Sequence, residues 1–197
     1  MPGDQLTLFF PPSSHPLPEG FAYRPDVISS DEESGLLAEI ERLPFKEFQF
    51  YGFEGKRRVV SFGWRYDFSQ HKALPADSVP AFLRETCHKI QTASGFTLPE
   101  VEQVLVTEYA PGAPIGWHKD RPVFGNVMGL SLASPCTFRL RKPDGDGKWT
   151  RVSLRLEPRS AYLLSGAARW TWEHSIPPVD TLRYSITFRN RRSGTAS

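Results

Sequence analysis

The second half of the chain is dominated by short runs in which apolar and polar residues alternate. A period of two puts successive side chains on opposite faces of a β-strand, so these runs predict strands. They cover residues 101–109, 127–132, 136–142, 152–156, 161–164, 169–174 and 182–189. Turn residues separate them, as in Pro111-Gly112 and in the hairpin loop 143–147. About seven or eight short strands at spacings of about 8–12 residues predict a barrel or a jelly-roll sandwich.

Two helices are predicted in the first half of the chain and should pack outside the strands. The first carries an apolar stripe made of Leu36, Leu37, Ile40 and Leu43. Ser30 and Glu33 fit a capping box at the start of this helix, and Pro44 ends it. The second helix has Ser78 as its cap, and Gly95 ends it.

Two further β-like runs, 45–53 and 58–68, lie between the helices and are broken at Glu54-Gly55-Lys56. Residues 1–25 contain six prolines, so we expect an irregular arm there rather than a separate domain. The fold that these patterns predict is an α+β domain with a jelly-roll core and both helices outside it.

Composition narrows the class of protein. The chain of 197 residues has a formal net charge of +2, which is no polybasic signal for nucleic-acid binding, although basic residues cluster at 56–58, 139–142 and 189–192. Cys87 and Cys136 are its two cysteines, so we expect no disulfide framework, a reducing compartment and a cytoplasmic protein. The apolar stretch 6–10 is too short for a signal or membrane segment, so we expect neither export nor membrane association.

His118 and Asp120 are candidate metal ligands. Two residues apart on a strand, they would point to the same side and could reach one ion together. His174 would complete a set of two histidines and one carboxylate, which leaves coordination positions open and suits non-haem Fe(II). The spacing alone is weak evidence, because about half a match to His-x-Asp or His-x-Glu is expected by chance in a chain of this composition.

The last predicted strand places two arginines on one face. One face carries Arg183, Ser185, Thr187 and Arg189, and the other carries Tyr184, Ile186 and Phe188. Two guanidinium groups in one cavity repel each other unless anions compensate them. A dicarboxylate co-substrate and the carboxylate of Asp120 could supply those anions, since arginine binds a carboxylate with two parallel hydrogen bonds. The alternative from these residues alone is an edge strand whose arginines face solvent.

Three motifs together resemble the AlkB family of Fe(II)/2-oxoglutarate dioxygenases. They are YAPGAPIGWHKD at 109–120, GAARWTWEHSI at 166–176 and RYSITFR at 183–189, in the family's order and at its usual separations. The resemblance covers residues from about 104 to 191, and the three motifs in sequence make it specific. It implies the double-stranded β-helix (jelly-roll) fold, and it overrides the edge-strand alternative for the two arginines.

The resemblance implies a role for each matching residue. It makes His118, Asp120 and His174 the catalytic iron ligands. Arg183 would bind the distal carboxylate of 2-oxoglutarate, and Arg189 would lie near Asp120 and the other end of the co-substrate.

Three further residues would contact the co-substrate, and two of them depart from the family's pattern. Tyr109 matches a family tyrosine that hydrogen-bonds to 2-oxoglutarate, whereas Thr107 and Ser185 stand where the family usually has asparagine. Both keep a hydroxyl group on the cofactor face. We therefore expect weaker hydrogen bonding there rather than loss of binding.

Residues 56–69 resemble the family's nucleotide-recognition lid, which ends in a Tyr-x-aromatic-Ser pattern. The segment combines cations for phosphates with aromatic rings for an unstacked base. The substrate-binding residues expected from it are Arg58, Trp64, Tyr66 and Phe68. Phe68 would stack on the extruded base opposite the His118 ring, and Tyr66 would contact sugar or phosphate. The alternative is an ordinary strand with Tyr66 and Phe68 in the core.

With this assignment the chain divides into an arm at 1–25, helices and lid at 26–100, and a dioxygenase core at 101–192, within one structural domain. Other conspicuous side chains are expected to fill core or strand positions, namely Cys136, Trp117, Trp149, Trp170 and Trp172. The histidines outside the motifs are expected to be incidental, namely His15, His71 and His88.

The implied reaction is oxidative dealkylation of an N-alkylated base in DNA or RNA by a monomeric enzyme. Iron and O2 convert 2-oxoglutarate to succinate and CO2, and the alkyl group leaves as an aldehyde. One alternative is a dioxygenase that acts on a protein side chain or a small molecule. Another is a non-catalytic scaffold that binds nucleic acid, and the intact ligand set argues against it.

Arg121 bears on which base would be preferred. In relatives that repair nucleic acid, an acidic residue usually follows the His-x-Asp within two positions and favours cationic bases, but here Arg121 and Pro122 stand there. Asp67 and Glu173 are expected to point away from the base. A cation at this place would repel a cationic base, so we expect a weaker preference for 1-methyladenine and relatively better activity on neutral ethenoadenine.

Overall fold

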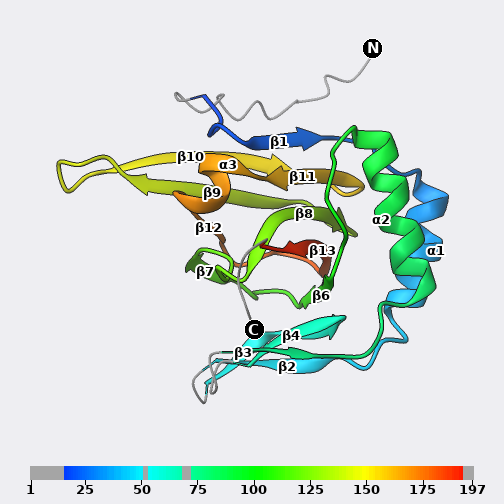
Figure 1. The fold of residues 1–197 in the computed structure, drawn as a ribbon. Helices are drawn as coiled ribbons and strands as arrows, with labels where there is room; N and C mark the ends of the chain where they lie inside the picture. Colours follow the sequence, from blue (N-terminus) through cyan, green and yellow to red (C-terminus); the bar gives the residue numbers. More distant parts are fainter. Residues whose placement is uncertain (1–15, 51–52, 68–71, 193–197) are drawn as a thin grey trace, which may run out of the picture.

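The computed structural model describes residues 16–50, 53–67 and 72–192. Nearly half of them lie in antiparallel strands, which form a large sheet, a smaller sheet that faces it, and a two-stranded sheet beside them (Figure 1). Three helices complete the described part. None of the helices in these residues is long and apolar enough to cross a membrane.

Two sheets make up the body of the protein. In spatial order the large sheet consists of β1 (Phe21–Arg24), β11 (Ser160–Leu164), β8 (Phe124–Leu132), β13 (Arg183–Arg191), β6 (Gln103–Tyr109), β3 (Phe53–Phe62) and β2 (Lys46–Phe50). The small sheet consists of β10 (Trp149–Leu156), β9 (Cys136–Pro143), β12 (Glu173–Ile176) and β7 (Ile115–His118). The separate hairpin consists of β4 (Trp64–Asp67) and β5 (Lys72–Pro75).

Two long helices, α1 (Ser30–Ile40) and α2 (Ala81–Ser94), lie side by side and cover one face of the large sheet (Figure 1). The apolar face of β13 packs into the same core as these helices, through Tyr184, Ile186 and Phe188. A second core lies between the two sheets and includes Tyr109, Phe138 and Tyr162. The polar face of β13 is therefore turned toward the space between the sheets, as the alternation in its sequence predicts.

Thirteen strands occur in the described residues, more than the seven or eight predicted. The expected irregular arm contains one of them, because β1 pairs with β11 from Phe21 to Arg24. Four residues between turns are too few for a clear alternating pattern. The run 169–174, predicted as a strand, instead contains the end of the short helix α3 (Gly166–Trp170) and the start of β12.

The predicted break between the two early β-like runs is also misplaced. Glu54-Gly55-Lys56 lie within β3, and the run 58–68 is divided at Gly63. Gly63 has φ +74°, and a Cβ atom there would lie 2.0 Å from the carbonyl oxygen of Glu102. Only glycine fits such a close approach in the left-handed region, so the chain changes direction at this residue and starts β4.

The starts of both long helices differ from the prediction. The capping box of α1 is formed by Ser29 and Glu32, one residue earlier than the predicted pair. Pro80 is the N-cap residue of α2, in place of Ser78, because the backbone stays extended up to Pro80. Gly95 ends α2 in the left-handed conformation, as predicted.

Glu33, which was assigned to the capping box, has a long-range role instead. Its side chain is buried and accepts hydrogen bonds from the backbone N–H of Ala133 (2.8 Å) and from Nη1 of Arg159 (3.1 Å). These contacts join α1 to the turns at the ends of β8 and β11. Sequence alone does not show which acidic side chain at the start of the helix turns inward, so Glu33 was assigned to the capping box in place of Glu32.

Candidate metal and co-substrate site

The three predicted metal ligands meet where β7 and β12 run side by side. His118 and His174 are opposite each other in this strand pair, and their ring centroids are 4.2 Å apart. Asp120 does not share a strand with His118, as was predicted, because β7 ends at His118. Its carboxylate nevertheless returns to the histidines, with Oδ2 lying 3.6 Å from Nε2 of His174.

Contacts on the far side of two of these ligands fix their orientation. Nδ1 of His118 lies 2.9 Å from the carbonyl oxygen of Gly116. A proton on Nδ1 would be donated to that carbonyl and would leave the lone pair of Nε2 for an ion. Oδ1 of Asp120 accepts hydrogen bonds from Nε (3.0 Å) and Nη2 (2.6 Å) of Arg189. Its Oδ2 is therefore the oxygen that remains beside the histidines.

Burial and neighbouring charges put these groups in the protonation states that metal binding needs. Burial lowers the pKa of His174 to about 3, and His118 beside it acts in the same direction. Burial also lowers the pKa of His118, against the opposing effect of Asp120. For Asp120, burial would raise the pKa, but Arg189 and the two histidines hold it well below its usual range. At neutral pH the set is two neutral imidazoles and one carboxylate.

This donor set fits a divalent iron ion bound by two nitrogens and one oxygen, with positions left open. In residues 16–50, 53–67 and 72–192, however, no group of three or more His, Cys, Asp or Glu side chains is arranged closely enough to hold a metal ion. His118 and His174 are opposite each other, and the Asp120 carboxylate lies 3.6 Å from His174. The chemistry of the donors, rather than a preformed cage, supports the assignment.

Arg183 supplies the cation predicted for a co-substrate carboxylate. It is 1% exposed, its guanidinium carbon lies 4.9 Å from the ring centroid of Tyr109, and its Nη2 donates to Oγ of Ser131 at 3.2 Å. Its Nε and Nη1 have no hydrogen-bond partner within the described residues. Buried charged donors in native proteins are almost always paired, so these two atoms fit a bound carboxylate.

The other predicted co-substrate residues line the same face. Ser185 is opposite Thr107 in the pairing of β13 with β6, and Arg183 is opposite Tyr109 one step along the strands. All four side chains are buried. The structure therefore brings together every predicted cofactor residue, with Arg189 at the other end of the row.

Of the predicted substrate residues, Arg58 points away from this site. It donates two hydrogen bonds of 2.7 Å to Glu108 and lies over the ring of Phe45, on the helix side of the large sheet. Arg57, its neighbour, lies on the site face, with its guanidinium carbon 6.0 Å from the ring centroid of Tyr109. Arg58 is therefore, contrary to the prediction, not on the site face, whereas Arg57 is, and the alternation of β3 against the Tyr109 face would have shown this.

Two of the remaining predicted substrate residues, Trp64 and Tyr66, lie on β4. Tyr66 is half-buried beneath Arg121, whose guanidinium carbon is 4.6 Å from the ring centroid. Trp64 is half-buried beneath Arg191 at 4.7 Å. Phe68 and the side chain of Asp67 lie outside the described part, so the predictions for them remain predictions. Glu173 accepts a hydrogen bond from Arg141 at 2.7 Å, on the outer face of the small sheet, away from His174.

Arg169 is a residue that the sequence analysis missed. It is 2% exposed and donates to four backbone carbonyl groups in the segment after His118, namely those of Asp120 (3.3 Å), Arg121 (2.8 Å), Phe124 (2.7 Å) and Gly125 (2.7 Å). Arg169 itself belongs to α3, just before the strand that carries His174. The Arg169 side chain thus connects the segment that contains Asp120 to the segment that leads to His174. Hydrogen bonds to backbone carbonyl groups do not restrict the acceptor residues, so they produce no sequence motif. The sequence feature that could have identified Arg169 was its position five residues before His174.

The tryptophans and cysteines divide between core and surface. Cys136 and Trp172 are buried, as predicted, and Cys87 and Cys136 are both free. Trp117 is half-buried between Arg139 and Arg141 on the outer face of the small sheet. Trp170 is 40% exposed, so its prediction as a filler is wrong.

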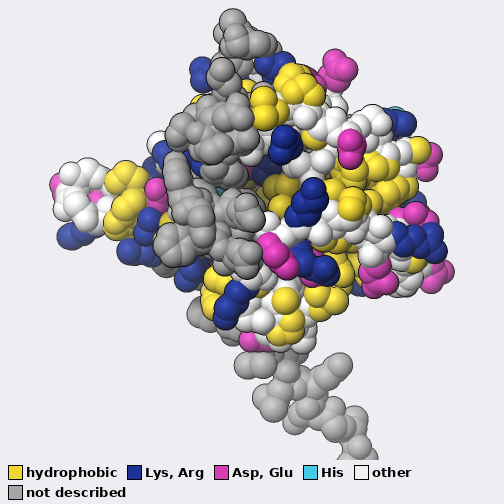
Figure 2. All heavy atoms as spheres, turned by 90° about the horizontal axis from the view of Figure 1, so that it is seen from below, with side chains coloured by type: hydrophobic (Ala, Val, Ile, Leu, Met, Phe, Trp, Pro, Cys, Tyr) yellow, Lys and Arg dark blue, Asp and Glu magenta, His cyan; other side chains and the backbone are white. Residues whose placement is uncertain are grey.

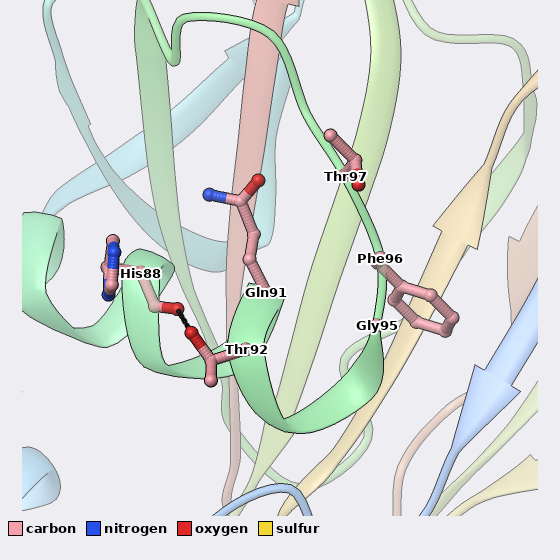
Figure 3. A pocket seen from close by; sticks show the side chains of 6 residues that line it. All are labelled: His88, Gln91, Thr92, Gly95, Phe96 and Thr97. Atoms are coloured by element: carbon pink, nitrogen blue, oxygen red, sulfur yellow. Dashed lines mark hydrogen bonds between the residues drawn. The ribbon is translucent and has the colours of Figure 1, made fainter.

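A hollow of ≈ 410 Å³ at the end of α2 is distinct from this site (Figure 3). It is lined by His88, Gln91, Thr92, Gly95, Phe96 and Thr97. Its polar groups are largely used locally, since Thr92 donates to the carbonyl of His88 (3.0 Å) and Gln91 accepts from the N–H of Leu98 (2.8 Å). Nothing in this hollow gives His88 a chemical role.

Comparisons with known proteins agree with the geometry. The family profile described as "2OG-Fe(II) oxygenase superfamily" matches residues 45–189. The chain is 33% identical over 168 residues to "Probable RNA/DNA demethylase ALKBH6" of Danio rerio, which covers 80% of this chain and 69% of that protein. It is 28% identical over 181 residues to "tRNA (carboxymethyluridine(34)-5-O)-methyltransferase ALKBH8" of Mus musculus, which covers 88% of this chain. The chain spans only 27% of the length of the mouse protein.

The fold is also that of solved oxygenase structures. The structure of OsALKBH1 superimposes with a TM-score of 0.71 at 15% identity, covering 91% of this chain and 100% of that one. This likeness shows that the two facing sheets form the double-stranded β-helix that the sequence predicts.

We expect Arg169 to control metal affinity through Asp120. Replacing it with methionine frees four carbonyl groups, and replacing it with lysine restores the charge but not the geometry of the guanidinium fork. Both variants should bind Fe(II) about tenfold or more weakly, the usual loss when a contact behind a metal ligand is removed. Anaerobic isothermal titration calorimetry measures this affinity. Arg155→Met, which removes an exposed arginine on β10, is the matched control. Lower thermal stability with parental iron affinity would show that Arg169 supports only the fold.

Proposed function

Because the chain belongs to the 2OG-Fe(II) oxygenase superfamily and, within it, to the AlkB homologues, we propose that it oxidatively dealkylates N-alkylated bases in DNA or RNA. The cofactors of this superfamily are Fe(II), 2-oxoglutarate and O2. Beyond membership of the family, we propose the substrate, the lid that holds it and the role of each residue.

The pair of unpartnered donors on Arg183 is the observation that carries the oxygenase part of the proposal. A guanidinium group that is 1% exposed and only partly hydrogen-bonded is costly without an anion. The other buried arginine of the row, Arg189, already has Asp120 as its anion. A dicarboxylate such as 2-oxoglutarate would complete the charge balance, with one end on Arg183 and the other toward the metal ligands.

The residues of the chain have distinct tasks in this proposal. His118, Asp120 and His174 would hold the iron, and Arg183 with Tyr109 would bind and orient the co-substrate. With all cofactors bound, the centre would hydroxylate the carbon attached to the base nitrogen, so that the alkyl group leaves as an aldehyde while 2-oxoglutarate becomes succinate and CO2. The buried strand face excludes water from the co-substrate, which strengthens each charged contact there.

Aromatic rings and cations near the mouth of the site support a nucleic-acid substrate. Arg57 lies on the site face beside Tyr109, and Arg121 covers the ring of Tyr66. Enzymes that act on a base hold it unstacked between side chains while cations bind its phosphates. The printed name of the Danio rerio relative is also that of an RNA/DNA demethylase.

An alkylated-oligonucleotide assay tests the proposed function. The parent protein with Fe(II) should restore the unmodified base only when 2-oxoglutarate is present, as measured by mass spectrometry of the oligonucleotide. Asp120→Ala should abolish both restoration and succinate formation, because the carboxylate ligand is lost. If the parent makes succinate but never repairs an oligonucleotide, the substrate is of another class. If Asp120→Ala makes succinate at the parental rate, the ligand assignment is wrong.

Arg183→Met should raise the Kd for 2-oxoglutarate by about a hundredfold or more, because removing one partner of a buried charge pair costs about 3–5 kcal/mol. Arg183→Lys should recover little of this loss, since lysine cannot form the two parallel hydrogen bonds. Iron affinity should stay at the parental level in both variants, and calorimetry measures both ligands. Normal 2-oxoglutarate affinity in Arg183→Lys would contradict the bidentate contact.

Arg121 leads us to propose a preference for neutral over cationic bases. Its guanidinium lies over Tyr66, where a cationic base would meet a like charge. Glu173 is engaged by Arg141 on the outer face and cannot offset it. In one oligonucleotide carrying both lesions, ethenoadenine should be repaired in preference to 1-methyladenine at a pH where the latter is cationic. Arg121→Glu should shift the ratio toward 1-methyladenine, and an unchanged ratio would mean that base charge is read elsewhere.

A further inference from the structure

Trp170 is exposed at the surface, next to the site and between two arginines. It is one of three large hydrophobic residues that are exposed within the described part of the chain. The guanidinium carbon of Arg169 lies 4.3 Å from its ring centroid, and that of Arg192 lies 5.0 Å from it. The indole is thus held between two guanidinium groups while 40% of its surface stays exposed, which is the arrangement of a contact surface rather than of a core residue.

Two more aromatic rings are covered by arginines around the loop that leads into β8, residues 121–123. Arg121 covers Tyr66, and Arg191 covers Trp64. The backbone N–H of Arg192 donates to the carbonyl of Val123 at 2.9 Å, and Arg191 is paired with Phe124. The loop therefore connects three arginine–aromatic pairs, which come from β4, α3 and the end of β13.

We propose that these six residues bind the single-stranded nucleic acid that flanks the reacting base. The surface, here termed the arginine–aromatic rim, consists of Trp64, Tyr66, Arg121, Trp170, Arg191 and Arg192. This inference rests on the proposed function and extends it from the base to the strand on either side of it.

The side chains of the rim favour nucleic acid as its partner. Single strands are held by aromatic rings that stack on bases and by cations that follow the phosphates, and the rim offers three of each. The acidic neighbour Glu102 lies 4.0 Å from Arg191, so it neutralises that charge only weakly. Lys and Arg side chains are spread over the face of the molecule on which β2, β3 and β4 lie, with Asp and Glu side chains among them (Figure 2).

The position of the rim suits a strand that has delivered a base to the site. The rim loop begins directly after Asp120, and Arg169 holds the loop against the segment that leads to His174. A base bound near His118 would leave its neighbouring nucleotides over Arg121 and Tyr66. From there the strand could continue toward Trp170 and Arg192, at the other end of the loop.

Binding of a fluorescein-labelled single-stranded oligonucleotide with one alkylated base tests the rim. Fluorescence anisotropy should show an increase in Kd of about tenfold for Trp170→Ala, the size expected for the loss of one stacked base. Arg192→Gln should weaken binding and reduce the slope of log K against log salt concentration by about one, the effect of one lost phosphate contact. Arg151→Gln removes an exposed arginine on β10, away from the rim, and should leave Kd and slope close to parental.

The outcomes of this experiment distinguish a failure of the rim proposal from a failure of the proposed function on which it rests. Parental Kd values in both rim variants would overturn the rim while leaving the proposed function intact. An equal loss in Arg151→Gln and Arg192→Gln would also overturn it, because net charge alone would then explain binding. If the parent protein itself binds no oligonucleotide and repairs none, the nucleic-acid function fails and the rim fails with it. Thermal unfolding of each variant shows whether it is folded.

Discussion

Asp120 keeps its negative charge inside the protein because Arg189 donates two hydrogen bonds to one of its oxygens. A carboxylate in this position would otherwise take up a proton, and a protonated acid is a poor metal ligand. The same contact turns the second oxygen toward His174. Arg189 in turn is held by Gln103 at 2.8 Å. The charge and the orientation of the carboxylate ligand both depend on this one buried ion pair.

β13 shows how much of this arrangement can be predicted from the sequence. Its alternation separates Tyr184, Ile186 and Phe188, which pack under the helices, from the arginines that face the site, and the structure has both faces as predicted. One strand supplies both the apolar side chains that pack under the helices and the arginines that face the site, and the period of two separates these two sets. The co-substrate row could be predicted because its members repeat along paired strands.

Other features depended on information that a local pattern does not contain. Arg57 and Arg58 are adjacent residues of the same type, and only the register of β3 against β6 decides which of them faces Tyr109. The start of β4 depends on the close approach of Gly63 to Glu102, which lies far along the chain. Trp170 looked like a core residue because its exposure is determined by α3, a helix of five residues with no periodicity of its own. The first two errors concern long-range contacts, and the third concerns a helix too short to show a period.

The four hydrogen bonds of Arg169 have a consequence for how this site can vary. All four acceptors are backbone carbonyl groups, which every amino acid possesses. The side chain at position 121 can therefore be exchanged without loosening the hold on Asp120, whereas Arg169 has no substitute with the same reach. The loop combines a fixed backbone with a replaceable side chain beside the substrate. Under the proposed function, a substitution at position 121 would change which base is preferred while the metal ligand stays in place.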